Sequence, residues 1–494
     1  MNLLEIRKFF LETGPQGADS YREALQEAIH VISGFFEACQ APYSGLDQTK
    51  LRQILAREVA DDQLPLPLAE VTKQSIHLIA QHSIIVQHPH CAAHLHTPPV
   101  IPALVAEAII SALNQSMDSW DQASAATYVE IQMVEWFAKR FGFRQTTDGT
   151  FTSGGTQSNF MGLLLARDAS CHQLSGHDVF ENGLPDYASK LCIVTSRLTH
   201  FSIVKSLAQL GLGSKAAVVV DCDSSGRMCP AALVKTLNEV RKQQKIPFAV
   251  VATAGTTDRG AIDLIAEIAP ICQRYNVWLH VDATYGGALI LTNERSRLNG
   301  IELADSIALD FHKFFYQPIS CGLFLLRDHH HFQLLEHHAD YLNRKEDSRP
   351  NLVEKSVLTS RRFDALKIWL TLKTIGSEAL GKMFERVLNL TRYAAQKISS
   401  EPKFGLLEEP QLSTVLFCYL PNDPTIGETL NQQLHENLLS SGRAIIGRTS
   451  HEGMTILKLT LLNPCLEKSD LDALVKIILS EGIRLENSSE NATV

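Results

Sequence analysis

The sequence lacks the cysteine pattern of a disulfide-bonded or metal-binding scaffold. Its ten cysteines form no CxxC pair, and several of them lie in apolar segments. Cysteines in this setting are typical of reduced residues in a protein core. They are residues 39, 91, 171, 192, 222, 229, 272, 321, 418 and 465.

The sequence also lacks a long apolar run and an excess of positive charge. No signal-peptide pattern stands at its start and no run approaches membrane-spanning length, so we expect a cytoplasmic protein without a membrane partner. A net charge of −9 and a pI near 6.1 argue against nucleic acid, which would need a basic face. The 494 residues, of which 45% are apolar, can bury more than one core and predict two or three domains.

Two groups of histidines invite a metal interpretation. They are His88, His90, His94 and His96, and then His329, His330, His331, His337 and His338. Metal sites need ligands that converge with an ordered second shell, and consecutive histidines cannot all point to one centre. We therefore predict no metal and expect the second group at a solvated helix start.

Residues 306–313, SIALDFHK, place a single lysine directly after a histidine at the end of an apolar run. At the exit of a buried strand, desolvation penalises the ammonium form of a lysine, so its amine can become a nucleophile toward a carbonyl. Lys313 is therefore the candidate for a Schiff base. An isolated His-Lys pair would more often be a surface feature.

Within residues 277–288, a second apolar strand ends at Asp282 and is followed by small residues. In an open α/β sheet, ligands bind at the carboxyl ends of the strands. A carboxylate there can hold the protonated pyridine nitrogen of pyridoxal phosphate. An isolated aspartate after a strand is commonly a helix N-cap. Its pairing with Lys313 favours the cofactor site.

Two further elements complete the pattern. Residues 151–159, FTSGGTQSN, open a helical pattern, and two glycines before a helix start let the backbone approach a phosphate, although such a turn is more often only a turn. Residues 250–257 form another strand, which runs into a glycine and two threonines. Its spacing from Asp282 fits one crossover helix between neighbouring parallel strands.

The order and spacing of these four elements resemble the group II pyridoxal-phosphate-dependent amino-acid decarboxylases, which include the glutamate and aromatic-amino-acid enzymes. The resemblance extends from about residue 85 to the C-terminus. Residues 114–122, 310–322 and 361–367 are most similar to the L-2,4-diaminobutyrate decarboxylases. The implied reaction converts L-2,4-diaminobutyrate to 1,3-diaminopropane and carbon dioxide.

The resemblance also implies roles for individual residues around the cofactor, pyridoxal 5'-phosphate. Lys313 would form the Schiff base, Asp282 would contact the pyridine nitrogen, and His200 would stack on the ring. The remaining cofactor contacts would be Gly155, Thr156 and His312 on the phosphate side, with Thr257 and Asp310 nearby.

Three residues are candidate substrate contacts. Thr97 matches a substrate-contacting threonine of the aromatic decarboxylases, and Arg361 matches the arginine that meets the substrate in glutamate decarboxylases. Asp118 stands where the aromatic decarboxylases have an aromatic residue that reaches the partner subunit's pocket. An aspartate there could bind the distal ammonium of a diamino acid. The alternative is a helix-capping or surface aspartate.

The chain departs from the family pattern at two places. Family members usually have Ala-Ala after the aspartate, whereas Thr284 places a hydroxyl near the rear face of the ring. Many relatives have a tyrosine on a mobile loop after the lysine, thought to be the proton donor, but residues 343–351 contain none. His200 and Tyr341 are the candidate donors here.

Alternating strands and helices predict an α/β fold with a mainly parallel sheet covered by helices on both faces. The predicted strands span 191–195, 216–220, 247–253, 277–282 and 305–310, and a helix spans 123–141. We expect a helical N-terminal dimerisation segment over 1–100, a cofactor-binding domain over 101–385 and a small α+β domain over 386–494. The family's dimers intertwine their N-terminal segments, so a homodimer is expected.

Alternative functions remain open from the sequence. An aminotransferase or another lyase on this fold would use the same lysine and aspartate but cleave a different bond. A catalytically dead relative would be expected to lose Lys313 or Asp282, and both are present. Glutamate, ornithine, lysine and aromatic amino acids remain possible substrates, because they share the main-chain chemistry.

Overall fold

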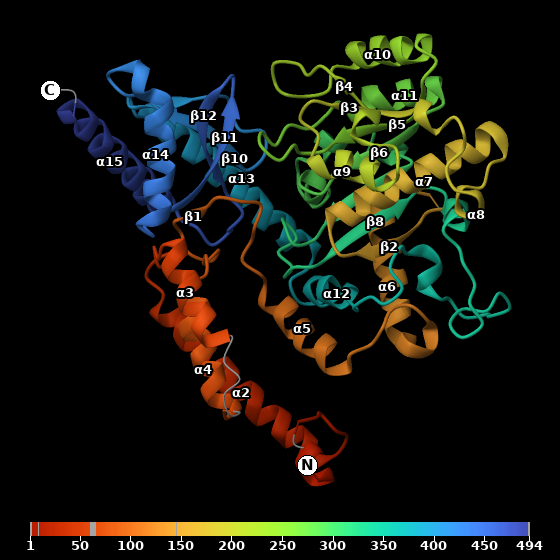
Figure 1. The fold of residues 1–494 in the computed structure, drawn as a ribbon, viewed down its shortest axis with the longest axis horizontal. Coiled ribbons are helices and arrows are strands. Elements are labelled where there is room, and N and C mark those ends of the chain that lie inside the picture. The colour runs from red at the N-terminus through yellow and green to blue at the C-terminus, as the bar shows by residue number, and fades with distance from the viewer. Residues whose placement is uncertain (1, 8, 60–65, 145, 493–494) are drawn as a thin grey trace. The chain divides into compact units, whose positions relative to one another are not determined.

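Seven strands form a mainly parallel sheet in the computed structural model, which describes residues 2–7, 9–59, 66–144 and 146–492 (Figure 1). Their order is β2-β8-β7-β6-β5-β3-β4. Strands β4, β3, β5, β6 and β7 are parallel, whereas β8 is antiparallel to both β7 and β2. The bounds are β2 Asp148–Thr152, β3 Leu191–Ser196, β4 Ala217–Val220, β5 Ile246–Thr253, β6 Trp278–Asp282, β7 Ser306–Asp310 and β8 Gly322–Leu326. The predicted fold class is confirmed.

The central strands are buried on both faces, which explains their nearly continuous apolar sequences. In β5 every residue from Pro247 to Thr253 is buried, and β7 is buried throughout. The register pairs Thr253 of β5 with Asp282 of β6, and Asp282 with Ala308 of β7. The carboxyl ends of these strands therefore meet at one edge of the sheet, as the sequence predicted.

Helices cover both faces of this sheet (Figure 1). Helices α7 and α9 lie on one face and α10 and α11 on the other. The helices of this part of the chain are α5 Ile101–Leu113, α6 Trp120–Arg140, α7 Gly155–Ser175, α8 Val179–Asn182, α9 Phe201–Gln209, α10 Pro230–Lys242, α11 Ile265–Tyr275 and α12 Ala365–Thr374. Buried apolar side chains of α7 and α9, such as Leu163 and Ile203, pack with β3 and β5 in one core cluster.

The contacts divide the chain into two units. The sheet lies in the unit formed by residues 95–392 and 409–414, and the other unit contains residues 1–94, 393–408 and 415–494. This division joins the N-terminal segment to C-terminal residues. The predicted three-part division of the chain, with its boundaries near 100 and 385, stays a prediction.

The unit that contains both termini is built around a five-stranded sheet with the order β1-β11-β12-β10-β9. Its strands are β1 Cys91–Ala92, β9 Phe404–Leu406, β10 Thr414–Tyr419, β11 Ile445–His451 and β12 Met454–Thr460. Its helices are α1 Leu3–Arg7, α2 Pro15–Ala38, α3 Gln48–Val59, α4 Leu68–Leu78, α14 Gly427–Ser440 and α15 Lys468–Ala492, and α13, Ser377–Ser400, spans the boundary between the units.

Short 3-10 helices connect the main elements. They are η1 Ala80–His82, η2 Ala188–Lys190, η3 Ser214–Ala216, η4 Gly286–Leu291, η5 Arg295–Leu298, η6 Ile301–Leu303, η7 His329–Leu334, η8 Leu352–Lys355 and η9 Pro424–Ile426. The histidines at 329 and 330 are exposed at the start of η7, which confirms the expected solvated helix start. Among the described residues, no helix combines the length and apolarity needed to cross a membrane.

Candidate active site

The lysine predicted to be the nucleophile lies beside two strand ends. Lys313 follows β7 by three residues, and its Nζ donates a hydrogen bond to Thr284 Oγ1 at 3.2 Å. The same nitrogen lies 3.8 Å from Asp310 Oδ2, and the lysine side chain is 16% exposed. The amine is therefore held at the sheet edge and is still accessible to a small molecule.

Asp282 presents an oriented carboxylate at the end of β6. The residue is buried, and its Oδ2 accepts a hydrogen bond from Asn159 Nδ2 at 2.9 Å. Its Oδ1 accepts a hydrogen bond from the backbone N–H of Thr284 at 3.1 Å. Donors to both oxygens hold this carboxylate in one orientation, and a carboxylate can accept from a protonated ring nitrogen.

The start of α7 is built to approach an anion closely. Gly154 has φ +144, a conformation that favours glycine, and a Cβ on Gly155 would lie 2.5 Å from Thr284 Cγ2. The first N–H groups of a helix have no intrahelical acceptor, and they favour negative charge. Gln157 Nε2 is also buried without a partner among the described residues. This set of donors fits a phosphate group.

His312 and Asp310 lie beside this helix start. The N–H of Gly155 donates to Asp310 Oδ2 at 3.3 Å, and a Cβ on Gly154 would lie 3.4 Å from His312 Cε1. His312 Nδ1 lies 2.6 Å from Asp310 Oδ1, although the geometry is not that of a hydrogen bond. Asp310 at the end of β7 and His312 just after it thus lie against the glycines that begin α7.

His200 immediately precedes α9 and is half-buried. Its Nδ1 lies 2.8 Å from Ser202 Oγ and accepts a hydrogen bond from Ser202 N at 3.3 Å. Burial lowers the pKa of His200, the negative charge of Asp282 opposes this, and the positive charge of Lys313 lowers the pKa further. Hydrogen bonds through Ser202 and Asn159 connect this imidazole to Asp282.

The other predicted site residues lie outside this hydrogen-bonded group. Thr156 is exposed in the first turn of α7, and Thr257 is half-buried in the loop after β5. Thr97 is buried with its hydroxyl 3.4 Å from the Pro98 carbonyl oxygen. Tyr341 is 89% exposed. Their roles toward cofactor or substrate stay predictions.

Arg361 has strong partners of its own. Its terminal nitrogens donate to the carboxylate of Glu130 at 2.9 and 3.2 Å, and one of them also donates to the Phe151 carbonyl at 3.2 Å. Both side chains of the ion pair are buried. Because Glu130 already neutralises the guanidinium, this geometry favours a structural role. A substrate contact by Arg361 remains a prediction.

Asp118 lies just before α6 and is 4% exposed. Its Oδ1 accepts a hydrogen bond from the N–H of Ser119 at 2.8 Å, and its carbonyl accepts one from Val353 N. A carboxylate this deeply buried is not a surface aspartate, whereas the helix-capping alternative and the substrate role both stay predictions.

The sequence interpretation missed two residues that contact the site. Asn159 holds Asp282 from α7, and His280 Nε2 lies 2.9 Å from Asn159 Oδ1. Successive residues of a strand point to opposite faces, so His280 and Asp282 share one face of β6. That spacing of two was a usable signal for His280, whereas nothing local marked Asn159.

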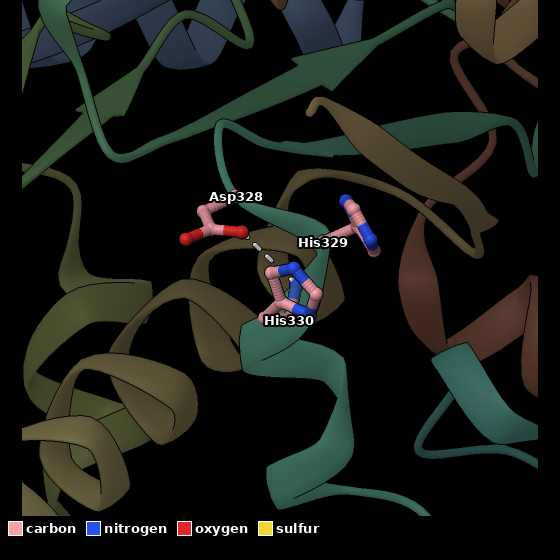
Figure 2. Close-up of side chains that lie close together, drawn as sticks. All are labelled: Asp328, His329 and His330. Carbon is pink, nitrogen blue, oxygen red and sulfur yellow. Dashed lines mark hydrogen bonds between the residues drawn. The ribbon is translucent and has the colours of Figure 1, made fainter. Parts of the chain in front are cut away.

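Asp328, His329 and His330 form a separate group in which one ligand atom of each lies within 4.8 Å of the others (Figure 2). Asp328 Oδ1 accepts a hydrogen bond from His330 N, and His329 Nδ1 lies 2.9 Å from the Thr146 carbonyl. These residues follow β8, which is antiparallel to β7, so they lie at the edge of the sheet opposite Lys313. The group takes no part in the site above.

Comparisons with known proteins show what the whole chain is similar to. A family model described as the pyridoxal-dependent decarboxylase conserved domain matches residues 50–420. An L-2,4-diaminobutyrate decarboxylase of Acinetobacter baumannii is 38% identical over 502 residues, which cover 99% of this chain and 98% of that protein. One from Rhizobium meliloti (strain 1021) is 41% identical over 468 residues, which cover 92% and 90%.

A solved structure extends this similarity to the fold. It is the glutamate decarboxylase domain of diaminobutyrate-pyruvate transaminase and L-2,4-diaminobutyrate decarboxylase from Vibrio parahaemolyticus. The TM-score is 0.91 at 43% identity, with 98% of this chain and 100% of that chain covered.

Proposed function

The chain belongs to the pyridoxal-dependent decarboxylase family, and we propose that its substrate is L-2,4-diaminobutyrate, which it converts to 1,3-diaminopropane and carbon dioxide. Its cofactor is pyridoxal 5'-phosphate, and its reaction class is the decarboxylation of an amino acid. The proposal concerns the identity of the amino acid that is decarboxylated.

The residues at the strand ends fit the cofactor. Lys313 would supply the amine that attaches it, Asp282 would supply a carboxylate for the ring nitrogen, and the start of α7 would supply donors for the phosphate. When bound, pyridoxal phosphate accepts the electrons of the bond between Cα and the carboxylate. The chain's contribution is to fix the orientation of the reacting bond, because orientation decides which bond at Cα breaks.

One observation carries the substrate proposal. Two diaminobutyrate decarboxylases are similar to nearly the whole chain, at 38% and 41% identity. Human acidic amino acid decarboxylase GADL1 is 31% identical over 86% of this chain. The higher identity and the longer coverage support a diamino acid over an acidic one.

Two of the candidate substrate contacts support the same choice. A distal ammonium needs a carboxylate partner, and Asp118 is a buried carboxylate. An acidic substrate needs a cationic partner, and the predicted one, Arg361, is already paired with Glu130. If Asp118 faces the pocket of a partner subunit, as the family resemblance implies, it selects the ammonium of diaminobutyrate.

A substrate panel tests the proposal. The holoenzyme is incubated with L-2,4-diaminobutyrate, glutamate, ornithine, lysine and aromatic amino acids, and carbon dioxide and amine products are quantified for each. We expect the highest kcat/KM with diaminobutyrate and an equal amount of 1,3-diaminopropane and carbon dioxide. A higher kcat/KM with another amino acid would replace the proposed substrate. Loss of the amino group without carbon dioxide would indicate an aminotransferase instead.

The proton that returns to Cα needs a donor, and we propose His200. Its ring is half-buried beside Lys313 and Asp282, whereas Tyr341, the other candidate, is 89% exposed. In deuterated water, His200→Gln should slow the incorporation of deuterium at the former Cα of the amine product more than Tyr341→Phe does. Equal rates for the wild type and His200→Gln would eliminate this histidine as donor.

A homodimer is proposed from apolar surfaces that the chain leaves uncovered. Helix α2 has no buried residue, and it exposes Ile29, Ile32 and Phe36 at the spacing of one helical face. A second copy that covers this face would remove it from water. Ile32→Glu should yield inactive monomer by sedimentation, with Glu37→Gln as the dimeric control. A stable and active monomer would contradict the proposal.

A cytoplasmic location is also proposed. All ten cysteines are free in the structure, which suits a reducing compartment. Cell fractionation with an antibody to the chain tests this, and recovery in an oxidising compartment would contradict it.

A further inference from the structure

A buried chain of hydrogen bonds runs along one face of β6 and ends at Asp282. Trp278 Nε1 donates to Ser306 Oγ at 2.8 Å, and Ser306 Oγ lies 2.8 Å from His280 Nδ1. His280 Nε2 lies 2.9 Å from Asn159 Oδ1, and Asn159 Nδ2 donates to Asp282 Oδ2 at 2.9 Å. The members from Ser306 to Asp282 are at most 3% exposed, so solvent does not replace any of these bonds.

The chain has a branch that reaches His200. Asn159 Nδ2 also donates to Ser202 Oγ at 3.1 Å, and Ser202 Oγ lies 2.8 Å from His200 Nδ1. Asn159 is therefore the junction between the two side chains that flank the cofactor site. A single amide on α7 connects both of them to His280.

The two ends of this chain of hydrogen bonds, Trp278 and Asp282, determine which atom donates and which accepts in each bond. Asp282 as a carboxylate only accepts, so the amide nitrogen of Asn159 must face it and the amide oxygen must face His280. His280 must then donate from Nε2, and its Nδ1 must accept from Ser306. Trp278 only donates, so Ser306 Oγ accepts from it and the Ser306 hydroxyl proton is free to donate to His280 Nδ1. The tautomer of His280 deduced from Asp282 therefore agrees with the one deduced from Trp278.

The same logic fixes the tautomer of His200. The second amide proton of Asn159 occupies Ser202 Oγ as an acceptor, so the hydroxyl proton is directed at His200 Nδ1. Ser202 N also donates to this nitrogen. His200 therefore carries its proton on Nε2.

Burial agrees with neutral histidines in this network. It lowers the pKa of His280, against the opposing charge of Asp282, and it lowers the pKa of His200. The charged groups that interact with these rings are Asp282 at the end of β6, Asp310 at the end of β7 and Lys313 three residues later. The backbone also leaves space for the network, because a Cβ on Gly162 of α7 would lie 2.4 Å from His280 Nδ1.

We propose that Asn159 and His280 are positioning residues that hold Asp282 as an oriented carboxylate and fix His200 with its proton on Nε2. The inference rests on the cofactor-site roles of Asp282 and His200 and is independent of the proposed substrate. Without Asn159, Asp282 would retain the Thr284 N–H as a donor and lose the donor to Oδ2. Its anionic form would then be less stable.

The first test uses the full-length apoprotein with ¹⁵N-labelled histidine. Nitrogen chemical shifts report which ring nitrogen carries the proton, and His280→Gln and His200→Gln spectra assign the two signals. We expect both rings to be neutral with the proton on Nε2 at neutral pH. A proton on Nδ1 of His280, or a charged His280 ring, would overturn the proposal. This measurement needs no substrate and no Asn159 variant.

The second test compares Asn159→Leu with Thr195→Val. Thr195 of β3 is a matched control because it is as deeply buried as Asn159 and its hydroxyl bonds Thr199 outside this network. Asn159→Leu should weaken pyridoxal phosphate binding to the apoprotein and lower kcat by roughly 10- to 100-fold, the range for a lost hydrogen bond to a charged group. The acidic limb of its kcat profile should move to higher pH.

The control makes each outcome decisive. Thr195→Val should bind the cofactor as the wild type does and keep the wild-type pH profile. Equal losses in both variants would show a general packing effect and overturn the proposal. Wild-type cofactor affinity and an unshifted acidic limb in Asn159→Leu would overturn it as well.

Discussion

Breaking the Arg361–Glu130 pair decides whether this arginine is structural or contacts the substrate. Their side chains are 5% and 1% exposed, and Glu130 Oε1 also accepts the N–H of Phe151 at 3.1 Å. Removing one partner of a buried pair leaves a charge without compensation, which costs about 3–5 kcal/mol. We therefore expect Glu130→Gln and Arg361→Met each to lower the free energy of unfolding by about that amount.

Urea unfolding of the two single variants and the double variant measures this effect. The double variant carries no uncompensated charge, so its loss should be clearly smaller than the two single losses added together. The reasoning would be refuted if Arg361→Met kept wild-type stability and raised KM for the amino acid. That result would make Arg361 a substrate contact, as the resemblance to glutamate decarboxylases implies.

Four further predictions concern the site. Lys313→Ala and Lys313→Arg should abolish steady turnover in an amine-release assay, because no other amine can recycle the cofactor; normal turnover would exclude Lys313. Asp282→Asn should still bind cofactor but lose roughly 10²- to 10³-fold in kcat, and a small kinetic effect would count against its role. Asp118→Asn should raise KM for diaminobutyrate roughly 10- to 100-fold at unchanged cofactor affinity, and unchanged kinetics would leave it structural. Burial lowers the pKa of His280 to about 4, so the folded state binds fewer protons than the unfolded state between about pH 6.5 and 4. The protein should therefore lose stability as the pH falls through this range. His280→Gln should reduce that acid sensitivity in thermal melts, and a pH dependence identical to that of the wild type would disprove the prediction.

The parallel strands were predictable because burial on both faces leaves nearly continuous apolar runs. The predicted spans at 247–253 and 277–282 differ from β5 and β6 by one residue at the start. Strands β2 and β8 were not predicted. Strand β8 pairs antiparallel with both β7 and β2, and β2 lies far from β8 in the sequence, so no local sequence pattern predicts their pairing.

Site residues were likewise predictable where their own strand identified them, and not where they depend on partners distant in the sequence. Lys313 and Asp282 were predictable because Asp282 ends one apolar strand, Lys313 follows another by three residues, and parallel strands bring their carboxyl ends to one edge. The contact of Asn159 with His280 joins residues 121 positions apart. The pair of Arg361 with Glu130 spans 231 positions. Such partners become visible only when the packing of helix against sheet is known.

The attachment point of the cofactor is the most direct test of this site. Borohydride reduction of the holoenzyme fixes pyridoxal phosphate to its lysine, and peptide mass spectrometry then identifies that residue. We predict a phosphopyridoxyl group on the peptide that contains Lys313, and its absence from the Lys313→Ala variant. A phosphopyridoxyl group on any other lysine of the wild-type enzyme would contradict the site described here.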